Sequence, residues 1–163
     1  MTPLHKARTL ALAVPLLLMA GALGSQYIGG LYPCEMCHWQ RWPHEIAIVV
    51  ALFAFALTER PDASRAMTAL AAVAIMVSGG IGVFHAGVEY GWWQGLTTCS
   101  TAAPAGGSDA DILANIWATP VIRCDQAQWD LFGISLAGFN AIFSIGAGLL
   151  ILALLARRGT AAR

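Results

Sequence analysis

The chain contains few charged residues. Only 11% of its 163 residues are Asp, Glu, Lys or Arg, whereas soluble proteins average about 25%. The formal net charge is zero, so the composition offers no basic surface for nucleic acid or for an anionic membrane. The charges are also unevenly placed, because residues 9–34, 66–88 and 131–156 contain none. A membrane-spanning helix needs about 20 mostly apolar residues, and each of these three stretches is long enough.

A fourth apolar stretch is shorter. Residues 46–57 (IAIVVALFAFAL) lie between two glutamates and have no polar face, which a soluble helix would normally have. A helix from Trp42 to Thr58 would reach the lower limit of a span, with Pro43 in its first turn, where a missing N–H is tolerated. The sequence therefore predicts an all-α fold, a four-helix transmembrane bundle with spans at about 9–29, 42–58, 66–87 and 131–156. We expect residues 1–163 to form a single integral membrane domain.

Lysine and arginine gather on one side of these spans. Seven of the nine lie before the first span, between the second and third, or after the fourth, and only Arg41 and Arg123 lie elsewhere. Because cytoplasmic loops carry the excess of Lys and Arg, both termini are expected in the cytoplasm. The loops at about 29–41 and 89–130 are then outside. The first apolar stretch is longer than the 7–15 residues of a signal peptide, so we expect it to remain as a span.

Cysteine is scarce, and all four cysteines fall in the two outer loops. Cys34 and Cys37 lie in the first loop, and Cys99 and Cys124 lie in the second. Disulfides form and persist on the oxidising side of a membrane. An even number of cysteines on that one side is what redox pairs or structural disulfides require.

The second outer loop has no obvious large core. After a flexible stretch (STAAPAGGS), it contains Ile112, Leu113, Ile116 and Trp117, which would share one face of a helix. We expect a short amphipathic helix here. It would lie in the membrane interface or pack on the bundle.

The segment YPCEMCHWQRWPH permits two interpretations. Its C-x-x-C-H, Cys34 to His38, matches the attachment motif of c-type haem, and its C-x-x-C is typical of redox-active thiol pairs. A haem also needs an apolar pocket and usually a second axial ligand, but the loop at 29–41 is short and residues 89–130 contain neither Met nor His. We therefore favour thiol chemistry. The alternatives are a membrane-anchored c-type haem electron carrier and a noncatalytic four-span scaffold with structural disulfides.

Arg41 and His85 are candidate partners of a redox site at the membrane surface. Arg41 follows Cys37 by four residues, a spacing that places both on one face if helical geometry extends back to Cys37, and a nearby cation lowers a thiol pKa. A dithiol at this depth needs a lipid-soluble electron acceptor such as a quinone, whose developing charge a guanidinium would stabilise. His85 ends the third span at the same edge. Each could also be an ordinary interfacial residue, since Arg side chains near helix ends often extend toward the headgroups.

The chain resembles the DsbB family over nearly its whole length. The resemblance rests on the four-span layout and on the segments PCEMCHWQRWPH, GVFHAGVEYGWWQG, TTCS, PVIRCD and FGISLAGFN. Proteins of that family lie in the bacterial inner membrane, reoxidise the periplasmic thiol oxidase DsbA and pass the electrons to a quinone. The resemblance implies a quinone-dependent protein-dithiol oxidoreductase with periplasmic cysteine loops, a DsbA-like partner, and ubiquinone or menaquinone as acceptor.

The resemblance also implies roles for the four cysteines. Cys99 and Cys124 resemble the disulfide that DsbA attacks, with Cys99 as the partner in the mixed disulfide. Cys124 would then exchange with Cys34 and free Cys37, which resembles the thiolate that forms a charge-transfer complex with quinone.

Two further residues receive roles from the same resemblance. Arg41 would stabilise the Cys37 thiolate, and His85 lies where the family has a residue near the quinone ring. His38 and His44 receive no role. We expect no metal, because the sequence supplies no closed set of ligands.

Overall fold

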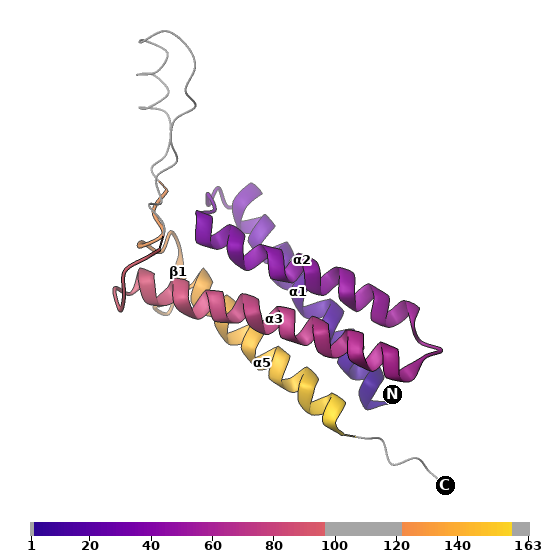
Figure 1. Cartoon of the computed structure of the whole chain (residues 1–163). Helices are drawn as coiled ribbons and strands as arrows, with labels where there is room; N and C mark the ends of the chain where they lie inside the picture. Colours follow the sequence, from indigo (N-terminus) through magenta and orange to yellow (C-terminus); the bar gives the residue numbers. More distant parts are fainter. Residues whose placement is uncertain (1, 97–121, 158–163) are drawn as a thin grey trace, which may run out of the picture.

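The computed structural model describes residues 2–96 and 122–157, which form four helices and a small hairpin (Figure 1). The helices are α1 (Pro3–Tyr27), α2 (Glu35–Ala56), α3 (Pro61–Glu89) and α5 (Leu136–Ala156). Helix α3 packs against both α2 and α5, and α1 contacts α2 and α5. The prediction of a bundle of helices is therefore confirmed. The amphipathic helix expected near Trp117 lies outside the described residues.

The connections between the helices gather at the two ends of the bundle. The N-terminus, the end of α5 and the α2–α3 turn lie at one end, and the segments that carry Cys34 and Cys124 lie at the other (Figure 1). At the first end, Arg8 donates a hydrogen bond to Ser64 Oγ (3.3 Å). At the other end, Gln128 donates one to the carbonyl of Tyr32 (2.6 Å). The antiparallel arrangement therefore brings the two predicted outer loops together.

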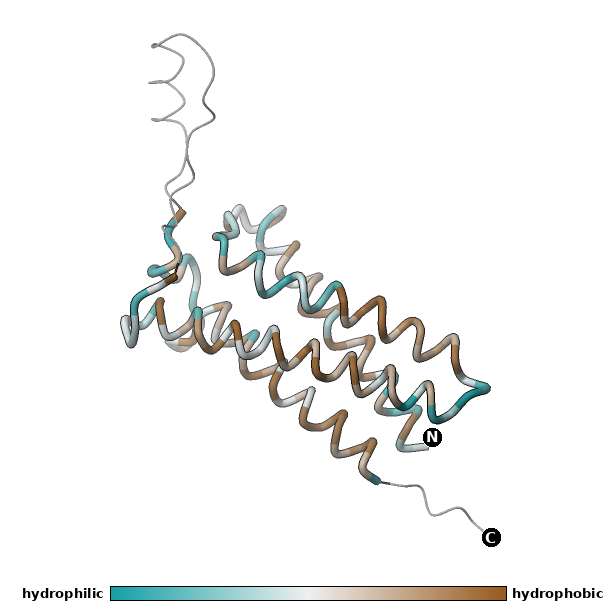
Figure 2. Tube along the Cα trace, in the orientation of Figure 1, coloured by the Kyte–Doolittle hydropathy of each residue, from teal (hydrophilic) through white to brown (hydrophobic). Residues whose placement is uncertain are grey.

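Helices α1, α3 and α5 are each long and apolar enough to cross a membrane, and Figure 2 shows apolar residues along the middle of the bundle. Small residues fill the interior, since the central cluster consists mainly of buried alanines together with Ile75, Ile151 and Leu155. Large apolar side chains such as Leu17 and Phe143 are exposed on the outside. Small residues between helices and large ones outside are typical of packing in a bilayer.

Helix α2 begins earlier than predicted. Cys34 is its N-cap, and Glu35 lies in its first turn, so the predicted helix start at Trp42 was wrong. Pro43 lies inside the helix, not in its first turn. The helix extends toward the N-terminus because the Cys34 side chain accepts a hydrogen bond from the Cys37 N–H (3.3 Å), which satisfies one of the free donors of the first turn.

The predicted span at 131–156 also begins too early. Residues 130–135 form a hairpin in which β1 (Asp130–Leu131) pairs antiparallel with β2 (Ile134–Ser135). Phe132 and Gly133, between the strands, both have positive φ (53° and 77°), as two-residue type I′ turns require. Ser135 caps α5 by accepting a hydrogen bond from the Gly138 N–H (3.1 Å). Uncharged sequence alone did not distinguish this turn from the helix.

Helices α3 and α5 approach closely at glycines. A Cβ atom at Gly82 would lie 2.9 Å from the Ala137 carbonyl oxygen and 3.1 Å from the Ala141 nitrogen. Both are backbone atoms, so neither can move aside without shifting α5. At Gly80, two residues away on α3, a Cβ atom would have nothing within 4 Å.

We expect Gly82→Ala to destabilise the bundle and Gly80→Ala to leave it unchanged or slightly more stable. Overpacking a close contact costs about 1–3 kcal/mol, whereas an open helical glycine gains helix propensity on replacement by alanine. Thermal unfolding of the two variants in the same detergent measures the difference. Equal midpoints for the two variants would contradict the close approach at Gly82.

Candidate functional site

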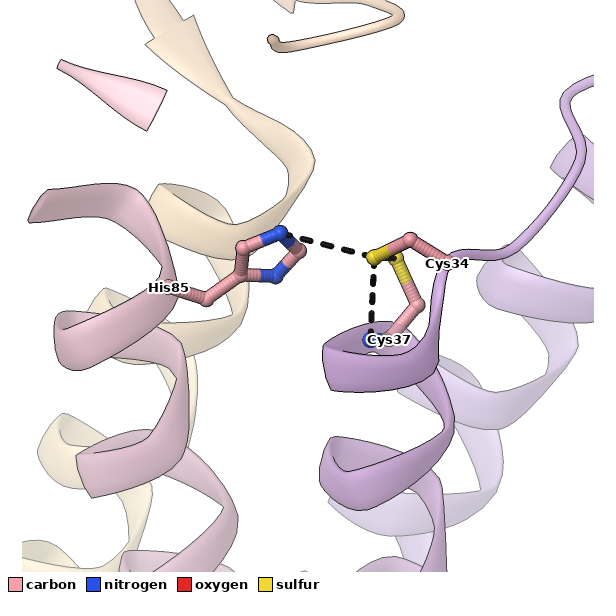
Figure 3. A group of neighbouring side chains, drawn as sticks. All are labelled: Cys34, Cys37 and His85. Atoms are coloured by element: carbon pink, nitrogen blue, oxygen red, sulfur yellow. Dashed lines mark hydrogen bonds between the residues drawn. The ribbon is translucent and has the colours of Figure 1, made fainter. Parts of the chain in front are cut away.

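The two cysteines of the C-x-x-C motif lie at the N-terminus of α2 (Figure 3). Their Sγ atoms are 2.8 Å apart and share a hydrogen bond. Both are free thiols; Cys34 is buried and Cys37 is half-buried. The capping geometry of Cys34 and the first turn of the helix hold the two sulfurs together, as a dithiol that can close to a disulfide.

The two thiols differ in acidity, and both precede the apolar part of α2. The hydrogen bond from Cys34 lowers the pKa of the Cys37 thiol, and the charge of Arg41 acts in the same direction. The hydrogen bond to Cys37 and burial both raise the pKa of Cys34. Cys37 is therefore the more acidic thiol of the pair, and its role as a thiolate stays a prediction.

His85 reaches the dithiol from α3, across from the start of α2 (Figure 3). Its Nε2 lies 3.5 Å from Cys34 Sγ and 3.6 Å from Glu89 Oε1. Its Nδ1 lies 2.8 Å from Gln40 Nε2. The backbone of Cys124 is also within hydrogen-bonding reach of the ring. The structure thus brings His85 to the cysteine pair, in contact with Cys34.

Cys124 belongs to the same buried cluster as Cys34, Met36 and Val88. It is disulfide-bonded. Cys99, the other predicted member of the second pair, lies outside the described residues. A sulfur of the second outer segment therefore lies beside the dithiol of the first.

Arg41 is held toward α1. Its guanidinium donates to Gln26 Oε1 (2.7 Å) and to the Ala22 carbonyl (3.3 Å). Within residues 2–96 and 122–157 it has no carboxylate partner, whereas Arg123 forms a two-bond ion pair with Asp125 (2.6 and 2.8 Å). In the described part of the chain, Arg41 is thus a positive charge near the dithiol without an ion-pair partner.

A cavity of about 250 Å³ opens beside these residues. Cys34, Cys37, Arg41 and His85 line it at the dithiol, together with further polar residues such as Glu89, Gln128 and Asn140. Apolar residues of α1 and α5 line another part of it, including Leu17, Leu18, Phe139 and Phe143. Leu17 is 71% exposed and Phe143 is 55% exposed. The cavity therefore extends from the dithiol to the apolar outer surface between α1 and α5.

The site also contains polar residues that the sequence analysis did not select. Gln40 and His44 on α2, Ser78 on α3 and Asn140 on α5 form a buried hydrogen-bonded network that ends at His85. The sequence feature that could have identified these residues is a polar side chain inside an otherwise apolar helix, because such side chains are energetically costly in a membrane and usually functional. Gln40 and His44, and likewise His85 and Glu89, are four residues apart, which places the members of each pair on one face of their helix.

Three donor atoms of the site could in principle hold a metal ion. The ligand atoms of Cys34, Cys37 and His85 lie within 4.8 Å of one another, and two thiolates with one imidazole are typical zinc ligands. The sequence did not reveal this group, because His85 is far from the cysteines along the chain. The expectation of no metal stays a prediction.

These features define a helical membrane protein that carries a free dithiol and, next to it, a disulfide-bonded cysteine. The chain belongs to the DsbB family: the family model described as Disulfide bond formation protein DsbB matches residues 5–154. The protein is thus a membrane oxidoreductase of disulfide bond formation, and the resemblance noted in the sequence is confirmed.

Two relatives are similar to this chain, and the name of one of them agrees with this assignment. Disulfide bond formation protein B of Marinobacter nauticus is 28% identical over 135 residues, which cover 77% of this chain and 76% of the relative. The protein RP370 of Rickettsia prowazekii is 24% identical over 136 residues, which cover 82% of this chain and 77% of the relative. No solved structure matches the chain.

Proposed function

We propose that the protein is a thiol:quinone oxidoreductase that reoxidises a DsbA-like periplasmic dithiol protein. Two electrons and two protons leave the partner's dithiol, which becomes a disulfide, and reduce one membrane quinone, ubiquinone or menaquinone, to quinol. One observation carries the proposal: the Cys34–Cys37 dithiol lines a cavity that reaches the apolar surface between α1 and α5.

The cavity suits a lipid-soluble quinone. A bound quinone supplies a two-electron acceptor at the membrane surface. Cys37, as the thiolate, is the electron-donating side chain. Arg41 lines the same cavity and would donate a charge-assisted hydrogen bond to a quinone oxygen. The exposed side chains of Leu17 and Phe143 would accommodate an apolar tail that leads into the lipid.

We infer that the four cysteines act as a relay of thiol–disulfide exchange. The partner's thiolate attacks Cys99 of a Cys99–Cys124 disulfide, and the partner's second thiol then releases Cys99, so that both cysteines are reduced. Cys124 attacks Cys34 of the oxidised first pair, which releases Cys37 as a thiolate. Cys99 then attacks Cys124, which restores the second disulfide and releases Cys34, and the Cys34–Cys37 dithiol closes to a disulfide as its two electrons and two protons pass to the quinone. Burial of Cys124 in one cluster with Cys34 supports the second exchange.

We propose that α2 is the fourth span, that both termini are cytoplasmic and that the cysteine segments are periplasmic, in a bacterial inner membrane. The span would be the part of α2 that follows the dithiol and Arg41, within a helix of 22 residues. From Ile46 onward its exposed positions include Val49, Leu52 and Phe53, so the outer face of this part is apolar, whereas Glu35, His38 and Glu45 are exposed nearer the dithiol. The distribution of Lys and Arg supports the orientation.

A reconstituted assay tests the proposed function. Reduced DsbA-like protein is added to the purified protein in liposomes with quinone, and quinone reduction is followed by absorbance. We expect reduction that stops when any one of the four cysteines is replaced by serine. Unchanged reduction in the Cys99→Ser and Cys124→Ser variants would remove the second pair from the route. A Soret band that survives denaturation would instead establish the haem alternative.

A further inference from the structure

The orientation of two buried amides is fixed by backbone carbonyls. Gln40 Nε2 lies 3.2 Å from the carbonyl oxygen of Met36, and Asn140 Nδ2 lies 3.2 Å from that of Ser78. Turning either amide over would place one oxygen against another. Asn140 Nδ2 also donates to Gln40 Oε1 (2.8 Å), which again requires the oxygen of Gln40 on that side. The second hydrogen of Gln40 Nε2 is thus directed at His85 Nδ1, 2.8 Å away.

The amide of Gln40 determines which nitrogen of His85 carries the proton. Because Gln40 donates to Nδ1, that atom must accept, and a neutral imidazole then has its proton on Nε2. The groups that face Nε2 are acceptors: Cys34 Sγ at 3.5 Å and Glu89 Oε1 at 3.6 Å. Gln40 is 7% exposed and His85 is 2% exposed, so little of either side chain is accessible to bulk water.

We propose that Gln40 is a positioning residue that fixes the proton of His85 on Nε2, so that His85 donates a hydrogen bond to Cys34 and does not serve as a metal ligand. A zinc ion bound between Cys34, Cys37 and His85 would need the lone pair of Nε2. The proton would then move to Nδ1, which metal-bound histidines donate to an acceptor. In this protein an N–H of Gln40 occupies that direction, and Gln40 can turn only by giving up its bonds to Met36 and Asn140.

The same proton placement has a consequence for the dithiol, and this step rests on the proposed function. Cys34 Sγ accepts from the Cys37 N–H at 3.3 Å and from His85 Nε2. With two donors facing its sulfur, Cys34 has its own S–H left to donate to Cys37 Sγ, 2.8 Å away. Gln40 therefore acts through His85 and Cys34 to favour the thiolate on Cys37, the sulfur next to Arg41.

Nitrogen NMR of the reduced protein in lipid tests the proton placement directly. In histidine-labelled protein, the His85 signals, identified by their loss in His85→Gln, should show a protonated Nε2 and an unprotonated Nδ1. Gln40→Glu replaces the donor by an acceptor and should move the proton to Nδ1. The matched control is Ser144→Ala, which removes a hydrogen bond to Asn140 Oδ1 (2.8 Å) without touching Gln40 or His85, and should leave the signals unchanged.

Zinc binding provides the second measurement. Zinc alone is titrated against the reduced protein in competition with a chelating dye. Gln40→Glu should bind zinc about 10–100-fold more tightly than the unchanged protein, the range of outer-partner effects on metal sites, and the gain should vanish in Gln40→Glu/His85→Gln. Gln40→Leu adds no charge and is used if the glutamate variant does not fold. In Gln40→Leu, His85 should show both tautomers, and the increase in zinc affinity should be smaller than in Gln40→Glu.

A proton on Nδ1 in the unchanged protein, or equal zinc affinity in all Gln40 variants, would overturn the proposal. Neither measurement contains quinone or a partner protein. A failure of these tests is therefore distinct from a failure of the proposed function, which only the liposome assay detects.

Discussion

Replacing Cys37 by serine is expected to abolish quinone reduction by a reduced dithiol protein. Cys37 lines the cavity, and the hydrogen bond from Cys34 lowers the pKa of its thiol, so we expect it to be the sulfur that donates electrons to the quinone. A serine hydroxyl has nearly the same size but forms neither a thiolate nor a disulfide. We expect the rate in the liposome assay to fall to that of liposomes without protein, while the thermal midpoint changes little.

Cys34→Ser is the matched control for this result. It also prevents the disulfide and stops turnover, but it leaves Cys37 in place, with a hydroxyl at position 34 that can still donate to the Cys37 thiolate. A broad visible band from a thiolate next to quinone is therefore expected in Cys34→Ser and not in Cys37→Ser. The noncatalytic scaffold alternative predicts that Cys37→Ser leaves quinone reduction unchanged, and that observation would exclude our assignment.

The parts of the fold that the sequence predicted depend on local composition. Long uncharged stretches identify α1, α3 and α5 because the cost of charge in a bilayer applies to each helix separately. Cys37 and Arg41 lie on one helix, so their proximity followed from their spacing on the condition, set in the sequence analysis, that the helix extends back to Cys37. The boundaries of α2 and α5 were missed because they depend on local caps, at Cys34 and Ser135, that hydropathy does not register.

The polar network could not be assembled from the sequence. Gln40 and Asn140 hydrogen-bond across 100 positions, and His85 meets Cys34 across 51. Both contacts depend on how α3 packs between α2 and α5, which small residues such as Gly82 allow. The sequence could indicate that each polar side chain in an apolar helix needs a hydrogen-bonding partner. Only the packing of the helices identifies that partner, and the partner in turn determines which nitrogen of His85 carries the proton.

Arg41→Ala should weaken quinone use far more than it affects folding. Loss of a hydrogen bond to a charged group costs about 1.5–3 kcal/mol, which corresponds to a decrease of about 10–100-fold in kcat/KM for quinone. Arg41→Lys should recover part of this loss, because lysine keeps the charge without the planar fork of the guanidinium. Steady-state kinetics with a short-chain quinone, compared with thermal unfolding of the same samples, measure both effects.

Gln26→Ala separates the charge of Arg41 from its contact with α1. Gln26 Oε1 accepts the shorter of the two hydrogen bonds that the guanidinium donates to α1, at 2.7 Å, so the variant loosens that contact and leaves the guanidinium in the cavity. If Arg41 only tethers α1 to α2, Gln26→Ala and Arg41→Ala must affect quinone kinetics in proportion to their effects on stability. We expect kcat/KM to remain within about threefold of the unchanged protein in Gln26→Ala, because the charge that would meet the quinone oxygen is retained. Wild-type quinone kinetics in Arg41→Ala would show that the arginine has no part in electron transfer.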